Sequence, residues 1–187
     1  MFQEKLILAS KSPRRKHLLE LADIEFDIQT KETDESFPTS MPIEEVPEYI
    51  ALQKARDIQL DFPKRTILAA DTVVVLNGDI IGKPTDRENA IEILSRLSGQ
   101  LHQVITGVVL VNSVQIISFS DVTEVEFHPL TLSQIEYYVD KFKPYDKAGA
   151  YAIQEWIGVV GIKKINGCFY NVMGLPISKV LYHYNKK

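Results

Sequence analysis

The stretch that decides the fold is Thr66-Ile-Leu-Ala-Ala-Asp-Thr-Val-Val-Val-Leu-Asn-Gly-Asp-Ile-Ile81. Residues 66–76 are mostly apolar or β-branched, which is typical of a strand buried in a sheet. Asn77-Gly78 is a strong signal for a tight hairpin turn, so residues 79–81 are expected to return antiparallel to the first strand. The chain is therefore expected to be built around a long central strand.

On both sides of this stretch the sequence alternates between strand and helix patterns. Before it, we predict strands at 5–9 and 26–28, helices at 12–21 and 44–60, and a polar loop at 31–42. After it, we predict helices at 85–97, 131–142 and 176–184, a short helix within 145–153, and long strands at 101–112 and 114–127. Alternation followed by a long antiparallel section is typical of the α/β class. We expect a long, twisted, mixed β-sheet with flanking helices, in two lobes around a central cleft.

Three of the predicted helices begin with capping signals. Ser12 is followed by Pro13, which suits the first position of a helix. Thr85 has Glu88 three residues later, which predicts a capping box at that helix start. Thr131 is expected to cap the helix that follows it.

The bulk properties fit one cytoplasmic domain over residues 1–187, with two lobes that share one sheet. The formal net charge of −4 argues against a nucleic-acid partner, and no apolar run approaches the roughly 18 residues that cross a membrane. The apolar run at 6–9 is too short for a signal sequence. Cys168 is the single cysteine, so no disulfide can form within the chain, and we expect it to be a small core residue.

The junction Ser10-Lys-Ser12-Pro-Arg14-Arg15 lies between a predicted strand and a predicted helix. Backbone N–H groups at a helix start favour anions, and arginine side chains suit phosphate because their donors are forked. The pattern predicts an anion cradle, although the same residues also occur at helix starts whose arginines are simply solvated.

Several charged residues could complete such a site. Asp71 interrupts an apolar strand, where a carboxylate needs a partner or a metal, or is held at a strand break by backbone donors. Lys83 follows the return strand in Gly82-Lys-Pro84, which is also an ordinary turn sequence. Glu35 leads the acids of the polar loop as a metal-ligand candidate, and Lys54 could face the cleft or solvent. The four histidines show no metal-ligand spacing.

The segment from Lys143 to Gln154 combines polar residues with small ones. Gly149 would let a ligand approach the backbone, and Lys147 could reach a phosphate. The Gln154 amide offers a donor and an acceptor to the edge of a nucleobase. Alternatively, this segment has no binding role and only connects a helix to a strand.

Together these motifs resemble those of the Maf family of nucleoside triphosphate pyrophosphatases. The matching stretches follow one another along nearly the whole chain: Leu8-Ala-Ser10-x-Ser12-Pro-Arg14-Arg15, Ala70-Asp71-Thr72, Gly82-Lys83-Pro84, Thr106-Gly107, Asp146-Lys147-Ala148-Gly149-Ala150-Tyr151-x-Ile153-Gln154, and Ile165-x-Gly167 with Asn171-Val-x-Gly174-Leu-Pro176. Six motifs in sequence order make the resemblance specific.

The resemblance implies a fold like that of inosine triphosphate pyrophosphatase, and metal-dependent hydrolysis of a nucleoside triphosphate to the monophosphate and pyrophosphate. It implies Mg²⁺ or Mn²⁺ as cofactor, a homodimer, and the removal of noncanonical nucleotides. It assigns Asp71 as the general base, and Glu35 with Asp71 as metal ligands. It assigns Arg14, Thr72 and Gln154 to substrate specificity. The residues it assigns to the phosphates are Ser10, Arg14, Arg15, Lys54, Lys83 and Lys147.

Gln154 favours dTTP and UTP over 7-methyl-GTP, because the family branch that prefers 7-methyl-GTP carries Glu at this position. A neutral amide also fits the 4-oxo and N3–H edge of a pyrimidine. The chain departs from the family pattern directly afterwards, with Glu155-Trp156 in place of a common Gly and with Gly158-Val-Val-Gly161. The rival functions are a 7-methyl-GTP pyrophosphatase, a nucleotide-binding regulator of septum formation, and a single-strand nucleic-acid binder.

Overall fold

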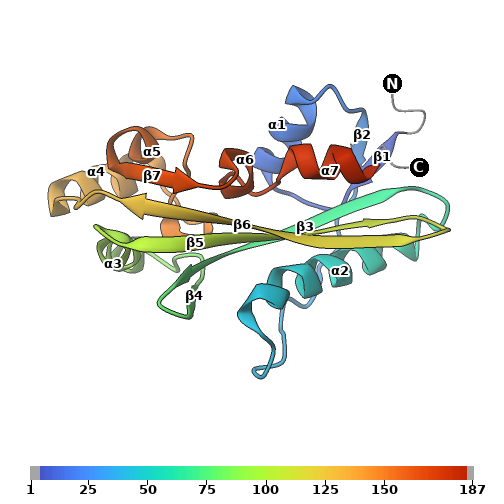
Figure 1. The fold of residues 1–187 in the computed structure, drawn as a ribbon, viewed down its shortest axis with the longest axis horizontal. Coiled ribbons are helices and arrows are strands. Elements are labelled where there is room, and N and C mark those ends of the chain that lie inside the picture. Colours follow the sequence, from blue (N-terminus) through green and yellow to red (C-terminus); the bar gives the residue numbers. More distant parts are fainter. Residues whose placement is uncertain (1–4, 185–187) are drawn as a thin grey trace. The chain divides into compact units, whose positions relative to one another are not determined.

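The computed structural model describes residues 5–184, and its strands form a seven-stranded mixed sheet (Figure 1). The strand order is β2-β1-β3-β5-β6-β7, and β4 pairs with β3 beside this path. The strands are β1 (Leu6–Leu8), β2 (Phe26–Ile28), β3 (Ile67–Leu76), β4 (Asp79–Ile81), β5 (Leu101–Val111), β6 (Ile116–Phe127) and β7 (Ile162–Asn166). The helices are α1 (Pro13–Leu21), α2 (Val46–Gln59), α3 (Arg87–Leu97), α4 (Leu132–Phe142), α5 (Trp156–Gly161), α6 (Phe169–Val172) and α7 (Ile177–Tyr184), with 3-10 turns η1 (Ile43–Glu45) and η2 (Ala148–Ala150). The predicted α/β class is confirmed.

The described residues divide into two compact units, and β3, β5 and β6 contribute residues to both. The first unit holds residues 5–71, 106–121 and 174–184, and the second holds residues 72–105 and 122–173. On β3 the boundary falls between Asp71 and Thr72. The expectation of one domain with two lobes around a cleft stays a prediction.

In the first unit, α2 packs on the strands through small side chains. β1 runs parallel to β3, with Ile7 paired to Ile67. Ala51 and Ala55 of α2 are buried in the same apolar cluster as these two isoleucines. Because alanine ends at Cβ, the helix can approach the strands closely. Figure 1 shows α2 and α7 on opposite sides of β3, β5 and β6.

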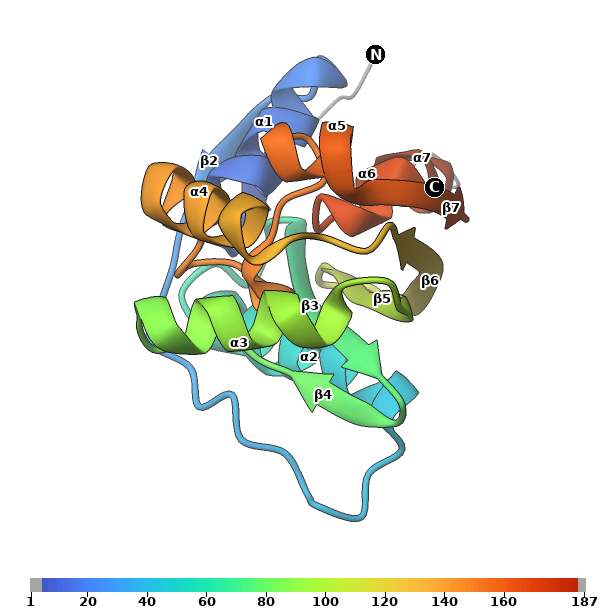
Figure 2. The same ribbon diagram turned by 90° about the vertical axis from the view of Figure 1, so that its left-hand side faces the viewer.

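In the second unit, the hairpin between β3 and β4 forms as predicted, with antiparallel pairing of Val75 and Ile80. Asn77 and Gly78 have φ values of 53° and 85°, and positive φ at both positions is what a tight two-residue hairpin requires. β7 pairs antiparallel with β6. Helices α3 and α4 lie side by side (Figure 2).

Of the caps predicted for α3 and α4, one is confirmed and the other is wrong. Thr131 and Gln134 form the full capping box of α4, so the predicted Thr131 cap is confirmed. The predicted box of Thr85 and Glu88 is wrong: Asp86 caps α3 by accepting from the Asn89 N–H. An aspartate one residue later supplies a better acceptor than the threonine, and it starts the helix one residue further on.

The region after Gln154 holds elements that the sequence reading did not include, namely α5, β7 and α6. The predicted short helix within 145–153 is reduced to the turn η2, since Gly149 has φ 70° inside it. The prediction of a core cysteine is wrong, because Cys168 is half-buried and directly precedes α6. Within residues 5–184, no helix is long and apolar enough to cross a membrane.

Candidate active site

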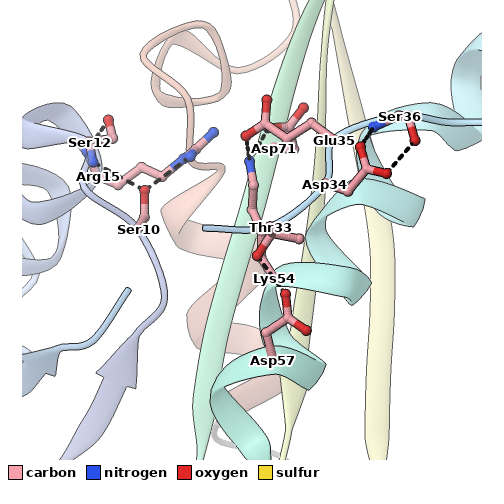
Figure 3. Close-up of polar contacts among 10 residues, drawn as sticks. All are labelled: Ser10, Ser12, Arg15, Thr33, Asp34, Glu35, Ser36, Lys54, Asp57 and Asp71. Atoms are coloured by element: carbon pink, nitrogen blue, oxygen red, sulfur yellow. Dashed lines mark hydrogen bonds and ion pairs between the residues drawn. The ribbon is translucent and has the colours of Figure 1, made fainter. Parts of the chain in front are cut away.

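Arg15 is held at the start of α1 by contacts from two directions, and Figure 3 shows the contact with Ser10. Its Nε donates to the carbonyl of Gly174 at 2.8 Å, and its Nη1 donates to Ser10 Oγ at 3.2 Å. Ser12 caps the helix by accepting from the Arg15 N–H at 3.4 Å. Ser10 Oγ also accepts from the Ser12 N–H at 3.2 Å. The junction predicted as an anion cradle is therefore ordered, with the Arg15 guanidinium fixed rather than simply solvated.

Lys54 lies between two carboxylates of the same unit. Its Nζ is 2.7 Å from Asp71 Oδ1 and 2.7 Å from Glu35 Oε1. The side chains of Lys54 and Asp71 are mostly buried, whereas that of Glu35 is 52% exposed. Asp71 and Thr72 are the only two positions of β3 that are not buried, so the break in the apolar pattern marks the place where the strand presents a polar group.

The charges around Arg15 connect the arginines to the carboxylates. Burial lowers the pKa of Arg15 below its ordinary value, the charges of Asp71 and Glu35 act to raise it, and the charge of Arg14 lowers it further. Arg14, Asp71 and Glu35 therefore all lie within electrostatic range of Arg15. Figure 3 shows the Arg15 side chain extending from α1 toward Asp71.

The donor set around Lys54 fits a hard divalent cation. A carboxylate oxygen of Glu35 and one of Asp71 both contact the same cation, the ammonium of Lys54. Among the described residues, no group of three or more His, Cys, Asp or Glu could hold a metal ion. Mg²⁺ is commonly held by one or two carboxylates together with substrate phosphates, so two acids suffice.

The remaining predicted site residues belong to the second unit. Lys83 is exposed after β4, and the Gly82 carbonyl beside it accepts from the Gly149 N–H at 3.1 Å. That bond brings the Lys83 turn next to the segment of Lys147, whose side chain is mostly buried. Gln154 is exposed at the end of the same segment. Gly149 cannot be replaced by a larger residue without strain, because a Cβ there would meet Val74 at 2.9 Å in a left-handed backbone.

The structure brings together six predicted residues in the first unit, Ser10, Arg14, Arg15, Glu35, Lys54 and Asp71. It also adds groups that the sequence reading missed. The Gly174 carbonyl anchors Arg15, and Tyr138 contacts Glu155 in the second unit. The motif Gly174-Leu-Pro176 pointed to the Gly174 group in the sequence. Tyr138 lies on the apolar face of a helix, so nothing in the sequence indicates that its hydroxyl makes hydrogen bonds.

A polar cavity of about 260 Å³ adjoins the Glu35 loop in the first unit. Its lining residues are Thr33, Asp34, Ser36, Tyr49, Gln53 and Asp57. Thr33 donates to Asp57 Oδ2 at 2.6 Å, and both the N–H and the hydroxyl of Ser36 donate to Asp34. The Thr33 bond ties the predicted polar loop to α2, which also carries Lys54, and the Ser36 bonds fold the loop on itself beside Glu35 (Figure 3).

Known proteins resemble the chain over nearly its full length. A dTTP/UTP pyrophosphatase from Cytophaga hutchinsonii is 52% identical over 176 residues, which cover 94% of this chain and 81% of that protein. A dTTP/UTP pyrophosphatase from Bacteroides thetaiotaomicron is 48% identical over 179 residues, which cover 94% and 92%. A solved HAM1 protein from Coxiella burnetii matches with a TM-score of 0.50 at 17% identity, covering 97% of this chain and 100% of that one. The last match bears out the expected Ham1-like fold.

The family model described as Maf-like protein matches residues 5–186, which include every motif that carried the resemblance. The chain belongs to the Maf-like protein family.

Proposed function

We propose that the protein hydrolyses dTTP and UTP to the nucleoside monophosphate and pyrophosphate. The observation that carries this proposal is the cluster in which Lys54 bridges Asp71 and Glu35 within electrostatic range of Arg15. It combines an oriented carboxylate with cations that match a polyphosphate. The relatives at 52% and 48% identity, both named dTTP/UTP pyrophosphatase, support the choice of substrate.

In the proposed reaction, Asp71 accepts a proton from the attacking water. The water oxygen bonds to the α-phosphorus, the bond from this phosphorus to the bridging oxygen breaks, and pyrophosphate leaves with the electron pair. The Lys54 ammonium holds the Asp71 carboxylate in one orientation at 2.7 Å. An Mg²⁺ or Mn²⁺ ion held by Glu35 and Asp71 would supply charge neutralisation for the phosphates.

The other polar residues bind and orient the triphosphate. Arg15 has its guanidinium fixed by Ser10 and the Gly174 carbonyl, so it can meet a phosphate with little loss of side-chain entropy. Ser10 and Arg14 contribute from the same junction. On the second unit we assign Lys83 and Lys147 to the phosphates.

We assign the choice of base to Gln154, with Arg14 and Thr72. The Gln154 side chain is exposed, and its amide can accept from a pyrimidine N3–H and donate to the 4-oxo group. A carboxylate in its place would favour a base with more donors, as in 7-methyl-GTP.

A substrate panel tests the proposal. Purified protein with Mg²⁺ is given dTTP, UTP, dCTP, dATP, dGTP and 7-methyl-GTP, and pyrophosphate release is measured. We expect dTTP and UTP to be the best substrates. Preferred cleavage of 7-methyl-GTP would favour that alternative, and no release from any triphosphate would favour a nucleotide-binding regulator. We further propose that the enzyme acts as a cytoplasmic homodimer, which light scattering after size-exclusion chromatography tests for its oligomeric state.

A further inference from the structure

The hydroxyl of Tyr138 contacts the chain on both sides of Gln154. Tyr138 lies on α4 and is fully buried. Its hydroxyl donates to Glu155 Oε2 and accepts from the Ala152 N–H at 3.2 Å. One side chain from a neighbouring helix therefore holds the segment that carries Gln154 at two points, one before it and one after it.

The main chain around Gln154 is a closed turn. The Glu155 N–H donates to the Ala152 carbonyl at 3.0 Å, and the Gly158 N–H donates to the Glu155 carbonyl at 2.9 Å. A Cβ at Gly158 would lie 1.7 Å from the Ile153 carbonyl oxygen, so the backbone at the end of the turn touches the backbone at its start. Ile153 is buried, whereas Gln154 is exposed. The turn is thus packed on its inner side and presents the Gln154 side chain outward.

A glutamine selects a base only if its amide keeps one direction. The amide carries a donor at one end and an acceptor at the other. A 4-oxo pyrimidine presents an acceptor beside a donor, and a 4-amino pyrimidine presents the reverse order. An amide that can turn about its Cγ–Cδ bond satisfies either base unless a neighbouring group and the position of its backbone favour one direction. Selection for dTTP and UTP over dCTP therefore needs the Gln154 backbone held in one place relative to the base.

Glu155 also connects this turn to Lys147. The carboxylate oxygen that does not meet Tyr138 lies 3.6 Å from Lys147 Nζ, and the same ammonium is 2.7 Å from Asp146 Oδ1. The Lys147 side chain is 10% exposed, and its ammonium lies between these two carboxylates. Tyr138 holds Glu155, and Glu155 in turn faces the lysine that we assign to the phosphates.

We propose that the Tyr138 hydroxyl is a positioning group for base selection, because it fixes the Gln154 turn through Glu155 and the Ala152 N–H. This inference rests on the proposed dTTP/UTP hydrolysis and adds a determinant of specificity to it. Tyr138 acts through Gln154 and does not itself touch the substrate.

The test compares the ratio of kcat/KM for dTTP to that for dCTP in wild type and variants. Tyr138→Phe keeps the ring and removes the hydroxyl, and we expect the ratio to fall about fivefold, as the loss of one net hydrogen bond implies. Tyr137→Phe is the matched control, because Tyr137 is the neighbouring residue on α4 and its hydroxyl accepts from the exposed Lys141 at 2.7 Å. The control should keep the wild-type ratio.

Two variants of Glu155 give an independent route that leaves Tyr138 in the core. Glu155→Ala removes the acceptor of the hydroxyl, and the ratio should fall as in Tyr138→Phe. Glu155→Gln keeps an acceptor but removes the charge near Lys147, so it should retain the ratio while raising KM for dTTP. Should Tyr138→Phe fail to fold, the contrast between these two variants decides.

A purely structural role gives a different result. Tyr138→Phe and Glu155→Ala would then lower thermal stability and reduce kcat/KM for both triphosphates by the same factor, and the unchanged ratio would overturn the proposal. Wild-type protein that releases no pyrophosphate from dTTP would instead overturn the proposed function itself, together with the inference that rests on it.

Discussion

The ammonium of Lys54 donates to Asp71 Oδ1 at 2.7 Å, so the carboxylate that we assign as the base is oriented before any substrate binds. The same ammonium meets Glu35 at 2.7 Å. Lys54 comes from α2, whose alanines bring the helix onto the strands, and Asp71 comes from the one polar break in β3. The geometry of the base thus depends on how the helix that carries Lys54 packs on the strands.

Replacing Asp71 with Asn should nearly abolish pyrophosphate release. The amide keeps the size of the side chain and an oxygen for Lys54, but it cannot take a proton from water. We expect turnover to fall by ~10²–10⁴, the usual contribution of a general base, in a protein that still folds. The control is Asp79→Asn, since Asp79 is exposed on β4 and pairs with Arg96 at 3.7 Å. Wild-type turnover in Asp71→Asn would remove Asp71 from the mechanism.

Removal of divalent cations should stop the reaction reversibly. Glu35 and Asp71 supply only two carboxylates, so the phosphates must complete the coordination of the ion. EDTA should abolish pyrophosphate release and added Mg²⁺ should restore it. Glu35→Gln should raise the Mg²⁺ concentration needed for half-maximal activity by about tenfold, as loss of a charged ligand implies. Glu32→Gln, in the same loop and exposed, should not change it.

Much of the first unit could be predicted from the sequence. The strand, the Ser12 cap and the arginines are local signals within residues 6–15, and the structure confirms the strand and the cap. The sequence could not predict that Lys54 contacts Asp71, because a helix residue 17 positions away can face the site or solvent with equal local propensity. Only the packing of α2 decides between the two.

The second unit shows where local signals fail. The residues after Gln154 form α5, β7 and α6, and none of these elements has more than six residues. Such short elements carry little periodicity and are held mostly by tertiary contacts, as Tyr138 holds Glu155. The departure from the family pattern at Glu155 was visible, but its partner on a distant helix was not.

Gln154→Glu should shift base preference. The amide donates to a 4-oxo group, whereas a carboxylate can only accept and so favours a base with more donors. We expect the ratio of dTTP to 7-methyl-GTP hydrolysis, each measured as kcat/KM, to fall by at least about tenfold, as for a hydrogen-bonded specificity contact. Gln103→Glu, on β5 of the same unit, gives the matched change of charge. An unchanged ratio would exclude Gln154 from contact with the base.

Stability should fall in mild acid because of His102. This side chain is 2% exposed, its Nε2 pairs with the Tyr151 hydroxyl at 2.8 Å, and burial lowers its pKa from 6.5 to about 4. Between these values the unfolded chain binds a proton that the folded chain does not, so stability is full above 6.5 and is lost as the pH falls toward 4. The contribution lost from pH 7 to pH 5 is about 2 kcal/mol.

Urea unfolding of wild type and His102→Gln at both pH values measures this contribution. The stability of wild type relative to the variant should shrink by that amount at pH 5, because the variant has no imidazole to titrate. His128→Gln is the control, since it removes an exposed imidazole and leaves His102 in place. An equal change in unfolding free energy between the two pH values for wild type and His102→Gln would show that His102 does not cause the pH dependence.

Gly107→Ala should destabilise the first unit strongly, because the glycine of the Thr106-Gly107 motif is required by the backbone of α2. A Cβ at Gly107 would lie 2.1 Å from Glu48 N and 2.3 Å from the Pro47 carbonyl carbon, and a helix backbone cannot move aside as a flexible side chain can. Overpacking of this kind costs about 3 kcal/mol or more. Gly82→Ala is the matched control, since a Cβ there meets nothing within 4 Å. Equal unfolding free energies of the two variants in urea would contradict the close contact. The control should keep its unfolding free energy within about 1 kcal/mol of wild type. Because α2 also carries Lys54, any Gly107→Ala protein that folds should also hydrolyse its substrate more slowly than wild type.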